Sequence, residues 1–212
     1  LLDIAAAPDR VHVPDRLVPV LGRLSAAFGG AVALVSGRPV AELDDLLSPL
    51  SLPCAGLHGA ERRDAAGAMH RIQVDGALDV ARERLVAFCR AHPGTLVEDK
   101  GAALALHYRE APAAAAAAEA EVLGVVESLA PRFVLQRGKC VLEIKPAGTS
   151  KALAVRAFMA EPPFAGRVPV FVGDDLTDED GFEEVNRRGG LSVRVGAGPT
   201  RATAALDTPA KV

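Results

Sequence analysis

The sequence is poor in cysteine and has no excess of basic residues. Only three of its 212 residues are cysteines, Cys54, Cys89 and Cys140, and none belongs to a Cys-x-x-Cys pair. This odd number and wide spacing argue against disulfides and zinc, so we expect buried thiols in a reducing compartment. The 24 Lys and Arg against 27 Asp and Glu give a formal charge of −3. Because the basic residues are also scattered, no nucleic-acid partner is expected.

Long apolar runs are missing as well. The apolar start of the chain is interrupted by Asp3, Pro8, Asp9 and Arg10, which is unlike a signal peptide, and no other stretch resembles a membrane span. Half of the residues are nevertheless hydrophobic, enough to cover the core of one large domain or two small ones. We expect a cytoplasmic globular monomer without a membrane partner. Because the chain starts without Met, we also expect that the natural chain continues upstream.

The most informative stretch runs from Val168 to Asp180. Its β-branched and aromatic start predicts a buried strand, and its Thr177-Asp-Glu-Asp end predicts a helix N-terminus. Asp174 and Asp175 then lie at the carboxyl end of a strand, where open α/β sheets bind ligands. Together with Asp178 they can converge on a cation such as Mg²⁺. An acidic first turn that is stabilised only by the helix dipole is the alternative.

Two further strand or helix ends carry candidate residues. An apolar strand over 31–35 ends at Ser36, and the strand-to-helix turn that follows can present the Ser36 hydroxyl to a phosphate. A Ser-Gly turn that only caps the next helix is the simpler interpretation. Lys151 falls in the first turn of a helix capped by Thr149 or Ser150, where a cation gains nothing from the helix dipole. This placement suggests a functional lysine. A third strand is expected over 54–59, with His58 packed or at a hinge.

The middle third has a different pattern. Hairpin strands over 95–100, 102–109, 133–136 and 140–145, with helices over 78–91 and 111–130, predict a small antiparallel sheet covered on one face. Alternation places a polar set on the other face. That set suits a ligand rich in hydroxyl groups, although a solvated face is the ordinary outcome. Its members are Glu98, Lys100, His107, Arg109, Lys139, Glu143 and Lys145.

These patterns predict a doubly wound, Rossmann-like α/β core interrupted by an α+β insertion. The core comprises residues 1–61 and 147–212, and the insertion comprises residues 62–146.

The order of the motifs resembles that of a known superfamily. Ser36, Lys151 and Gly173-Asp-Asp-Leu-Thr-Asp178 match the second, third and fourth motifs of the haloacid dehalogenase superfamily, and the insertion is similar to its larger α/β cap. Nearly the whole chain resembles the trehalose-6-phosphate phosphatases of that superfamily. The segments that carry this resemblance are Val35-Ser-Gly-Arg38, Gly56-Leu-His-Gly-Ala-Glu61, Glu98-Asp-Lys100, His107-Tyr-Arg109, Gly138-Lys139, Glu143-Ile-Lys-Pro146 and Gly173-Asp-Asp-Leu-Thr-Asp-Glu179.

The resemblance implies a Mg²⁺-dependent hydrolysis of trehalose 6-phosphate through an aspartyl-phosphate. Asp174 would bind the metal, with Asp175 nearby and Asp178 supporting the metal shell. Ser36 would bind the transferring phosphoryl group, and Lys151 would pair with its charge and with the nucleophile. The implied substrate-binding positions are Arg38, Glu98, Lys100, Arg109, Lys139 and Glu143.

One expected motif is missing. The family's nucleophile and general acid/base are the aspartates of an Asp-x-Asp-Gly-Thr strand, which would lie directly before Leu1, and Asp3 and Asp9 do not replace them. We therefore expect this strand upstream of Leu1. The alternatives are a phosphatase of another sugar phosphate, such as sucrose or mannosylglycerate phosphate, and a catalytically inactive module that binds a sugar phosphate.

Overall fold

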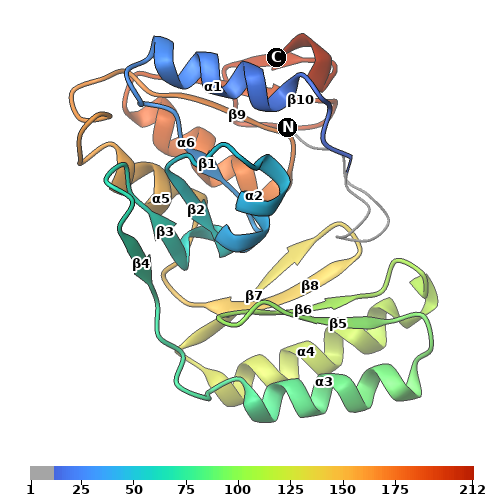
Figure 1. Cartoon of the computed structure of the whole chain (residues 1–212). Helices are drawn as coiled ribbons and strands as arrows, with labels where there is room; N and C mark the ends of the chain where they lie inside the picture. Colours follow the sequence, from blue (N-terminus) through green and yellow to red (C-terminus); the bar gives the residue numbers. More distant parts are fainter. Residues whose placement is uncertain (1–11) are drawn as a thin grey trace. The chain divides into compact units, whose positions relative to one another are not determined.

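A computed structural model describes residues 12–212 of the protein (Figure 1). Asp3 and Asp9 lie outside the described residues. The chain divides into two compact units. The first comprises Leu1–His70 and Ser150–Val212, and the second comprises Arg71–Thr149. The sequence placed the boundaries at 62 and 146 instead. They differ because β3 (Glu61–Arg63) and β4 (Met69–Arg71) extend a sheet of the first unit.

The described residues of the first unit form two separate sheets. In one, of order β1-β2-β3-β4, β1 (Leu34–Val35) runs parallel to β2 (Cys54–Gly56), which pairs antiparallel with β3. In the other, of order β11-β10-β9, all neighbours are parallel. Its strands are β9 (Val170–Gly173), β10 (Leu191–Val195) and β11 (Ala204–Leu206).

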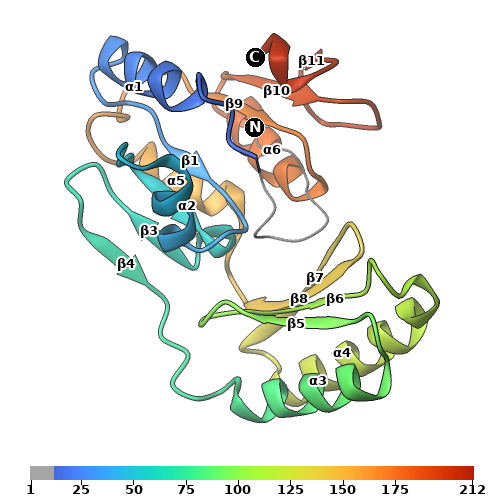
Figure 2. The same cartoon turned by 45° about the vertical axis from the view of Figure 1, so that its right-hand side comes forward.

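Four helices connect and cover these strands. They are α1 (Leu17–Ala27), α2 (Val40–Leu47), α5 (Lys151–Phe158) and α6 (Glu179–Arg187). Helices α5 and α6 pack side by side, as Figure 2 shows. Phe182 of α6 is fully buried and meets Phe171 of β9 edge-on at 5.7 Å between ring centres. The alternation of parallel strands with helices is the one that the sequence predicts for the core.

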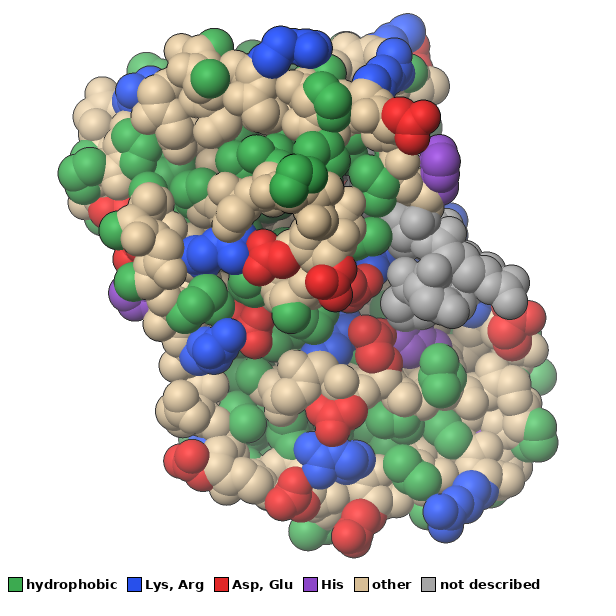
Figure 3. Space-filling model, in the orientation of Figure 1, with side chains coloured by type: hydrophobic (Ala, Val, Ile, Leu, Met, Phe, Trp, Pro, Cys, Tyr) green, Lys and Arg blue, Asp and Glu red, His purple; other side chains and the backbone are tan. Residues whose placement is uncertain are grey.

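Part of this unit leaves apolar surface open. Among the described residues, β1 and β9 each have an edge without a partner strand, and no residue of α1 is buried. Val168 and Val170 are 71% and 64% exposed, and Phe28, after α1, is 51% exposed. Figure 3 shows hydrophobic side chains gathered on the visible face of this unit. Such strands are normally covered on both sides.

The second unit is an antiparallel sheet of order β5-β6-β8-β7, with two helices on one face. The helices are α3 (Asp79–Ala91) and α4 (Ala115–Leu129), and the strands are β5 (Leu96–Asp99), β6 (Leu104–His107), β7 (Phe133–Gly138) and β8 (Val141–Pro146). Leu85, Val122, Leu106 and Ile144 are fully buried or nearly so where the helices meet the sheet. The hairpins and their apolar face agree with the prediction for the middle third.

Three local expectations need correction. The strand expected over 54–59 ends at Gly56, and a 3₁₀ turn, Leu57–Gly59, follows it. Lys139 and Cys140 form the turn before β8, with Cys140 at φ 60°, so Lys139 does not share a strand face with Glu143. The thiol expectation holds fully for Cys54 alone, because Cys89 and Cys140 are only partly buried, although all three are free.

No helix within residues 12–212 is long and apolar enough to cross a bilayer.

Candidate active site

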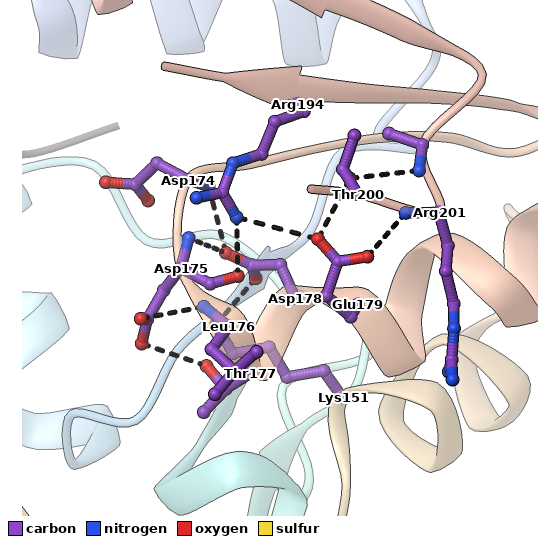
Figure 4. A network of polar contacts seen from close by, with 11 residues as sticks. Lys151, Asp174, Asp175, Leu176, Thr177, Asp178, Glu179, Arg194, Thr200 and Arg201 are labelled. Atoms are coloured by element: carbon purple, nitrogen blue, oxygen red, sulfur yellow. Dashed lines mark hydrogen bonds and ion pairs between the residues drawn. The ribbon is translucent and has the colours of Figure 1, made fainter. Parts of the chain in front are cut away.

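The acidic turn after β9 is built around the carboxylate of Asp178. Its Oδ2 atom accepts hydrogen bonds from the backbone N–H groups of Asp174 (3.0 Å) and Asp175 (2.9 Å), as Figure 4 shows. A side chain at position 173 would overlap the Asp178 carboxyl group, so only glycine allows this close approach. The turn is therefore fixed by side-chain packing as well as by the strand that leads into it.

Lys151 meets this carboxylate from the start of α5. Its Nζ atom lies 2.6 Å from Asp178 Oδ1, and both residues are buried. Ser150 caps α5 by accepting a hydrogen bond from the N–H of Leu153 at 3.2 Å, which holds Lys151 in the first helical turn. The position is unfavourable for a cation with respect to the helix dipole, and the anion that compensates it is Asp178.

Asp175 has a local task in the structure. Its Oδ1 accepts the N–H of Leu176 at 2.8 Å, and its Oδ2 accepts the Thr177 hydroxyl at 3.2 Å. Both oxygens thus cap the 3₁₀ turn Leu176–Asp178, which leads into α6. Asp178 Oδ2 in turn accepts the N–H of Asp175, which completes a capping box. The structural role that the sequence left open as an alternative for the acidic turn therefore applies to two of the three aspartates.

Asp174 is the aspartate left for a cation. Its carboxylate makes no hydrogen bond with a described residue and points away from Asp178 and Lys151 in Figure 4. Burial, followed by the charges of Asp178 and Asp175, raises its pKa above the ordinary value. A divalent cation would relieve this crowding of negative charge. Within residues 12–212 no group of three acidic, His or Cys side chains is arranged to hold a metal, so Asp174 fits as one ligand of an incomplete set.

The Ser36 turn follows β1. Ser36 Oγ accepts the N–H of Arg38 at 3.1 Å, which closes the turn locally. The Arg38 guanidinium forms an ion pair with Glu42 one turn along α2. The N–H of Val40 donates to Glu61 Oε2 at 3.0 Å and so completes the start of α2. Ser36 thus stands at a strand-to-helix turn, as predicted, and its hydroxyl closes that turn.

In the second unit, charged side chains link three strands of the polar face. His107 Nε2 lies 2.8 Å from Glu98 Oε2, Lys100 Nζ lies 4.0 Å from the same oxygen, and Lys100 Nζ lies 3.5 Å from Glu143 Oε2. Glu98 and Glu143 lie opposite Ala105 on the strand between them. Because the side chain of Ala105 is small, the longer side chains of Glu98 and Glu143 project beyond it on this face.

His107 was placed on the polar face by the sequence but was not among the implied substrate-binding positions. Burial raises the pKa of Glu98, but its hydrogen bond with His107 and the charge of Lys100 outweigh this and hold that pKa below the ordinary value. The sequence signal for a functional role of His107 was its position two residues before Arg109 on the expected polar face. We expected the side chains of Arg109 and Lys139 on one polar face. In the structure their contact involves the Lys139 backbone, because Arg109 Nη2 donates to the carbonyl of Lys139 at 3.3 Å.

Comparisons with known proteins identify the family of the chain. A protein-family model described as Trehalose-phosphatase matches residues 1–210. Over 206 residues the chain is 48% identical to the trehalose-6-phosphate phosphatase of Escherichia coli (strain K12), which covers 96% of this chain and 76% of that protein.

Solved structures show the same fold. The C-terminal domain of trehalose-6-phosphate phosphatase from C. albicans superimposes with a TM-score of 0.85 at 23% identity, over 99% of this chain and 84% of that chain. A haloacid dehalogenase-like hydrolase from Bacteroides thetaiotaomicron gives 0.62 at 14% identity, over 92% and 87%. The predicted fold class is therefore confirmed.

Proposed function

Because this chain belongs to the trehalose-phosphatase family, we propose that the protein hydrolyses trehalose 6-phosphate to trehalose and phosphate. The observation that carries the chemistry is the buried pair of Lys151 and Asp178, 2.6 Å apart beside the carboxyl end of β9. A buried lysine that is oriented by a carboxylate is suited to bind a phosphoryl group. Such a site performs phosphoryl transfer chiefly by positioning and charge stabilisation.

Each residue of the core site has a proposed role. The Ser36 hydroxyl hydrogen-bonds the phosphoryl oxygens, and Lys151 neutralises part of their charge. Asp178 orients Lys151 and fixes the backbone of Asp174. Asp174 would hold Mg²⁺, which prefers carboxylate, water and phosphate oxygens. When bound, that ion would stabilise negative charge on the phosphoryl group. Arg38 is proposed to bind the substrate when its ion pair with Glu42 is replaced by a contact with the substrate.

We place the nucleophile and the general acid/base on an Asp-x-Asp-Gly-Thr strand upstream of Leu1. Two structural features support this placement. The open edges of β1 and β9 can each accept a further parallel strand, and the exposed Val168 and Val170 are the side chains that such a strand would cover. A carboxylate nucleophile divides the hydrolysis into formation and breakdown of an aspartyl-phosphate.

The polar face of the second unit is proposed to recognise the sugar. Glu98, Lys100 and Glu143 form a charged row that can donate to and accept from sugar hydroxyls, and Arg109 and Lys139 lie at the next turn. We also propose a cytoplasmic location for the protein, supported by three thiols that form no disulfide.

The proposal is tested with two substrates. Trehalose 6-phosphate engages the polar face, whereas p-nitrophenyl phosphate needs only the core site. Glu143→Ala in the full-length enzyme should lower kcat/KM for the sugar phosphate by about 10- to 150-fold, since a charged hydrogen bond contributes roughly 1.5–3 kcal/mol. The aryl phosphate should change by less than about 3-fold on the same scale.

Glu119→Ala is the matched control, because Glu119 is an exposed carboxylate of the same unit, paired with Arg137. It should leave both substrates unchanged. Equal losses on both substrates for Glu143→Ala would remove the polar face from sugar recognition. If the wild-type enzyme were equally active on sucrose 6-phosphate and trehalose 6-phosphate, the proposed sugar specificity would be wrong. If the full-length protein hydrolysed neither substrate, only a role as a sugar-phosphate-binding module would remain.

A further inference from the structure

The turn after β2 has an unusual backbone. Leu57, His58 and Gly59 have φ values of 50°, 54° and 97° in succession. Leucine rarely adopts the left-handed region, and a run of such residues costs free energy that the surroundings must offset. Leu57 and His58 are also buried, at 0% and 6% exposure. Backbone strain of this kind persists where the structure around it demands that conformation, often beside a functional site.

One side of the turn holds the Ser36 loop. The N–H of His58 donates to the carbonyl of Ser36 at 3.0 Å, and the N–H of Leu57 donates to the carbonyl of Arg38 at 3.1 Å. The His58 ring lies directly against Gly37: a Cβ at position 37 would stand 2.8 Å from Nε2 and 2.9 Å from Cε1. The backbone of the loop and the imidazole ring are therefore in close packing contact.

The other side of the turn meets the start of α5. A Cβ at position 59 would stand 3.1 Å from the carbonyl oxygen of Ser150 and 3.7 Å from Cβ of Ala154. Ser150 is the N-cap of α5 and directly precedes Lys151. Because position 59 combines this close approach with a positive φ, only glycine is free of penalty there. The strained turn thus lies between the loop that carries Ser36 and the helix start that carries Lys151.

We propose that the Leu57–Gly59 turn is the spacer that sets the position of Ser36 relative to Lys151, and that His58 is its positioning residue through the contact of its ring with Gly37. The turn does not have to touch the substrate. It holds two phosphate-binding groups, contributed by elements far apart in sequence, in one geometry. The inference deepens the proposed function of the same site and rests on it.

The test uses both faces of the contact. His58→Gly removes the ring and relieves the left-handed strain at once. In the full-length enzyme kcat should fall by about 10- to 100-fold, because a displacement near 1 Å at a reacting group has an effect of that order. The loss should be equal for trehalose 6-phosphate and p-nitrophenyl phosphate, since both carry the phosphate group and the polar face of the second unit is untouched.

Gly37→Ala approaches the contact from the other partner. Gly37 does not have a positive φ, so the added methyl group acts through the His58 ring and should give a similar loss. In the double variant the methyl group occupies the space that the ring leaves. The double variant should therefore lose no more than the worse single variant, and its loss should be smaller than the product of the two.

Binding of inorganic phosphate, measured by calorimetry, provides a readout apart from turnover. Phosphate affinity should weaken by about 10-fold in both single variants, which remain folded by circular dichroism. A purely structural role of His58 predicts a lower melting temperature with unchanged kcat and phosphate affinity in the folded fraction, and that result would overturn the inference. Fully multiplicative losses would also overturn it. A wild-type enzyme that binds phosphate but does not hydrolyse trehalose 6-phosphate would instead refute the proposed function, while the effect of the variants on phosphate binding would still decide the role of the turn.

Discussion

Lys151 and Asp178 depend on each other for stability as well as for chemistry. Both are buried, and Asp178 also accepts two backbone N–H groups. Removal of the lysine charge leaves a buried carboxylate without its cation, which costs about 3–5 kcal/mol. We therefore expect Lys151→Met to lower the free energy of unfolding by about 3 kcal/mol and to abolish phosphatase activity. Urea denaturation followed by circular dichroism measures the first effect.

Arg137→Met serves as the control for that measurement. The Arg137 side chain is 57% exposed and pairs with Glu119 at 2.6 Å, and exposed ion pairs contribute about 1 kcal/mol or less. Its unfolding midpoint should stay close to that of the wild type. A Lys151→Met enzyme as stable as this control would show that Asp178 is sufficiently stabilised by its backbone hydrogen bonds alone.

We expect acid to destabilise the first unit through protonation of Glu184. Burial raises its pKa, but hydrogen bonds from Arg156, Arg187 and Arg188 outweigh this and lower the pKa to about 2. A carboxyl group with a depressed pKa stabilises the fold above its unfolded-state pKa, near 4.5, and this contribution is lost as the pH falls towards 2. Since Arg156 and Arg187 are more than half exposed, the contribution is screened to about 1–2 kcal/mol.

Unfolding by urea at pH 7, 5 and 3 tests this expectation. The wild type should lose more stability between pH 5 and pH 3 than Glu184→Gln, which has no carboxyl group to protonate at this position. At pH 7 the variant should already be the less stable of the two. Parallel pH curves for the two proteins would show that the arginine cluster does not couple Glu184 to acid unfolding.

At the scale of elements, one chain of charges links three strands of the second unit. His107 of β6 contacts Glu98 of β5, and Lys100 links Glu98 to Glu143 of β8. Loss of His107 removes the hydrogen bond that keeps Glu98 ionised and oriented. We expect His107→Ala to raise KM for trehalose 6-phosphate by about 10-fold, as for one charged hydrogen bond, with little effect on p-nitrophenyl phosphate.

The pH profile separates this role from simple packing. Without the His107 hydrogen bond, the pKa of Glu98 should rise from its depressed value, because burial then dominates. The acid limb of kcat/KM for the sugar phosphate should therefore move to higher pH in His107→Ala and return in part with His107→Gln, which can still donate a hydrogen bond. An unchanged limb in His107→Ala would assign the loss to packing.

The sequence predicts the elements better than it predicts their ends. The capped helix at Lys151 follows from a local pattern, and the structure contains it. The strand expected from Val168 begins only at Val170, and Val168 and Val170 are exposed where the sequence predicted burial. The end of β2 could not be predicted, because a left-handed Leu57 contradicts its propensity and arises from contacts with the Ser36 loop, which is distant in sequence. The same holds for Asp175: local spacing places it beside Asp174, but only three-dimensional hydrogen bonding separates their roles.

Pair interactions across elements were also beyond the sequence. Lys151 and Asp178 were each singled out, but their contact joins two helix starts that are 27 positions apart. The strand alternation placed Glu143 correctly and misplaced Lys139, because a turn with Cys140 at φ 60° precedes β8. Alternation holds only where the backbone is extended, and a left-handed residue ends it.

At the scale of the whole molecule, the described part of the first unit lacks cover for some of its strands. The edges of β1 and β9 have no partner strand, and the side chains of Val168 and Val170 are exposed. Burial of each such side chain stabilises a fold by about 1.5–3 kcal/mol. A further parallel strand would thus contribute to packing as well as chemistry. The polypeptide of residues 1–212 contains no Asp-x-Asp-Gly-Thr sequence, so its comparison with a longer chain separates the two contributions.

We expect the polypeptide of residues 1–212 to release no phosphate from trehalose 6-phosphate or p-nitrophenyl phosphate, and to bind the dye ANS on its exposed apolar surface. The chain extended by its upstream strand should turn over both substrates, bind less dye and gain at least about 3 kcal/mol of stability. Replacement of the first aspartate of the added motif by asparagine should abolish turnover while most of the gain in stability remains, because the strand still covers β1 and β9. Turnover by the shorter polypeptide would refute the proposed nucleophile. A gain in stability that disappears with the Asp→Asn change would show that the strand is held by its charge and not by the apolar surface it covers.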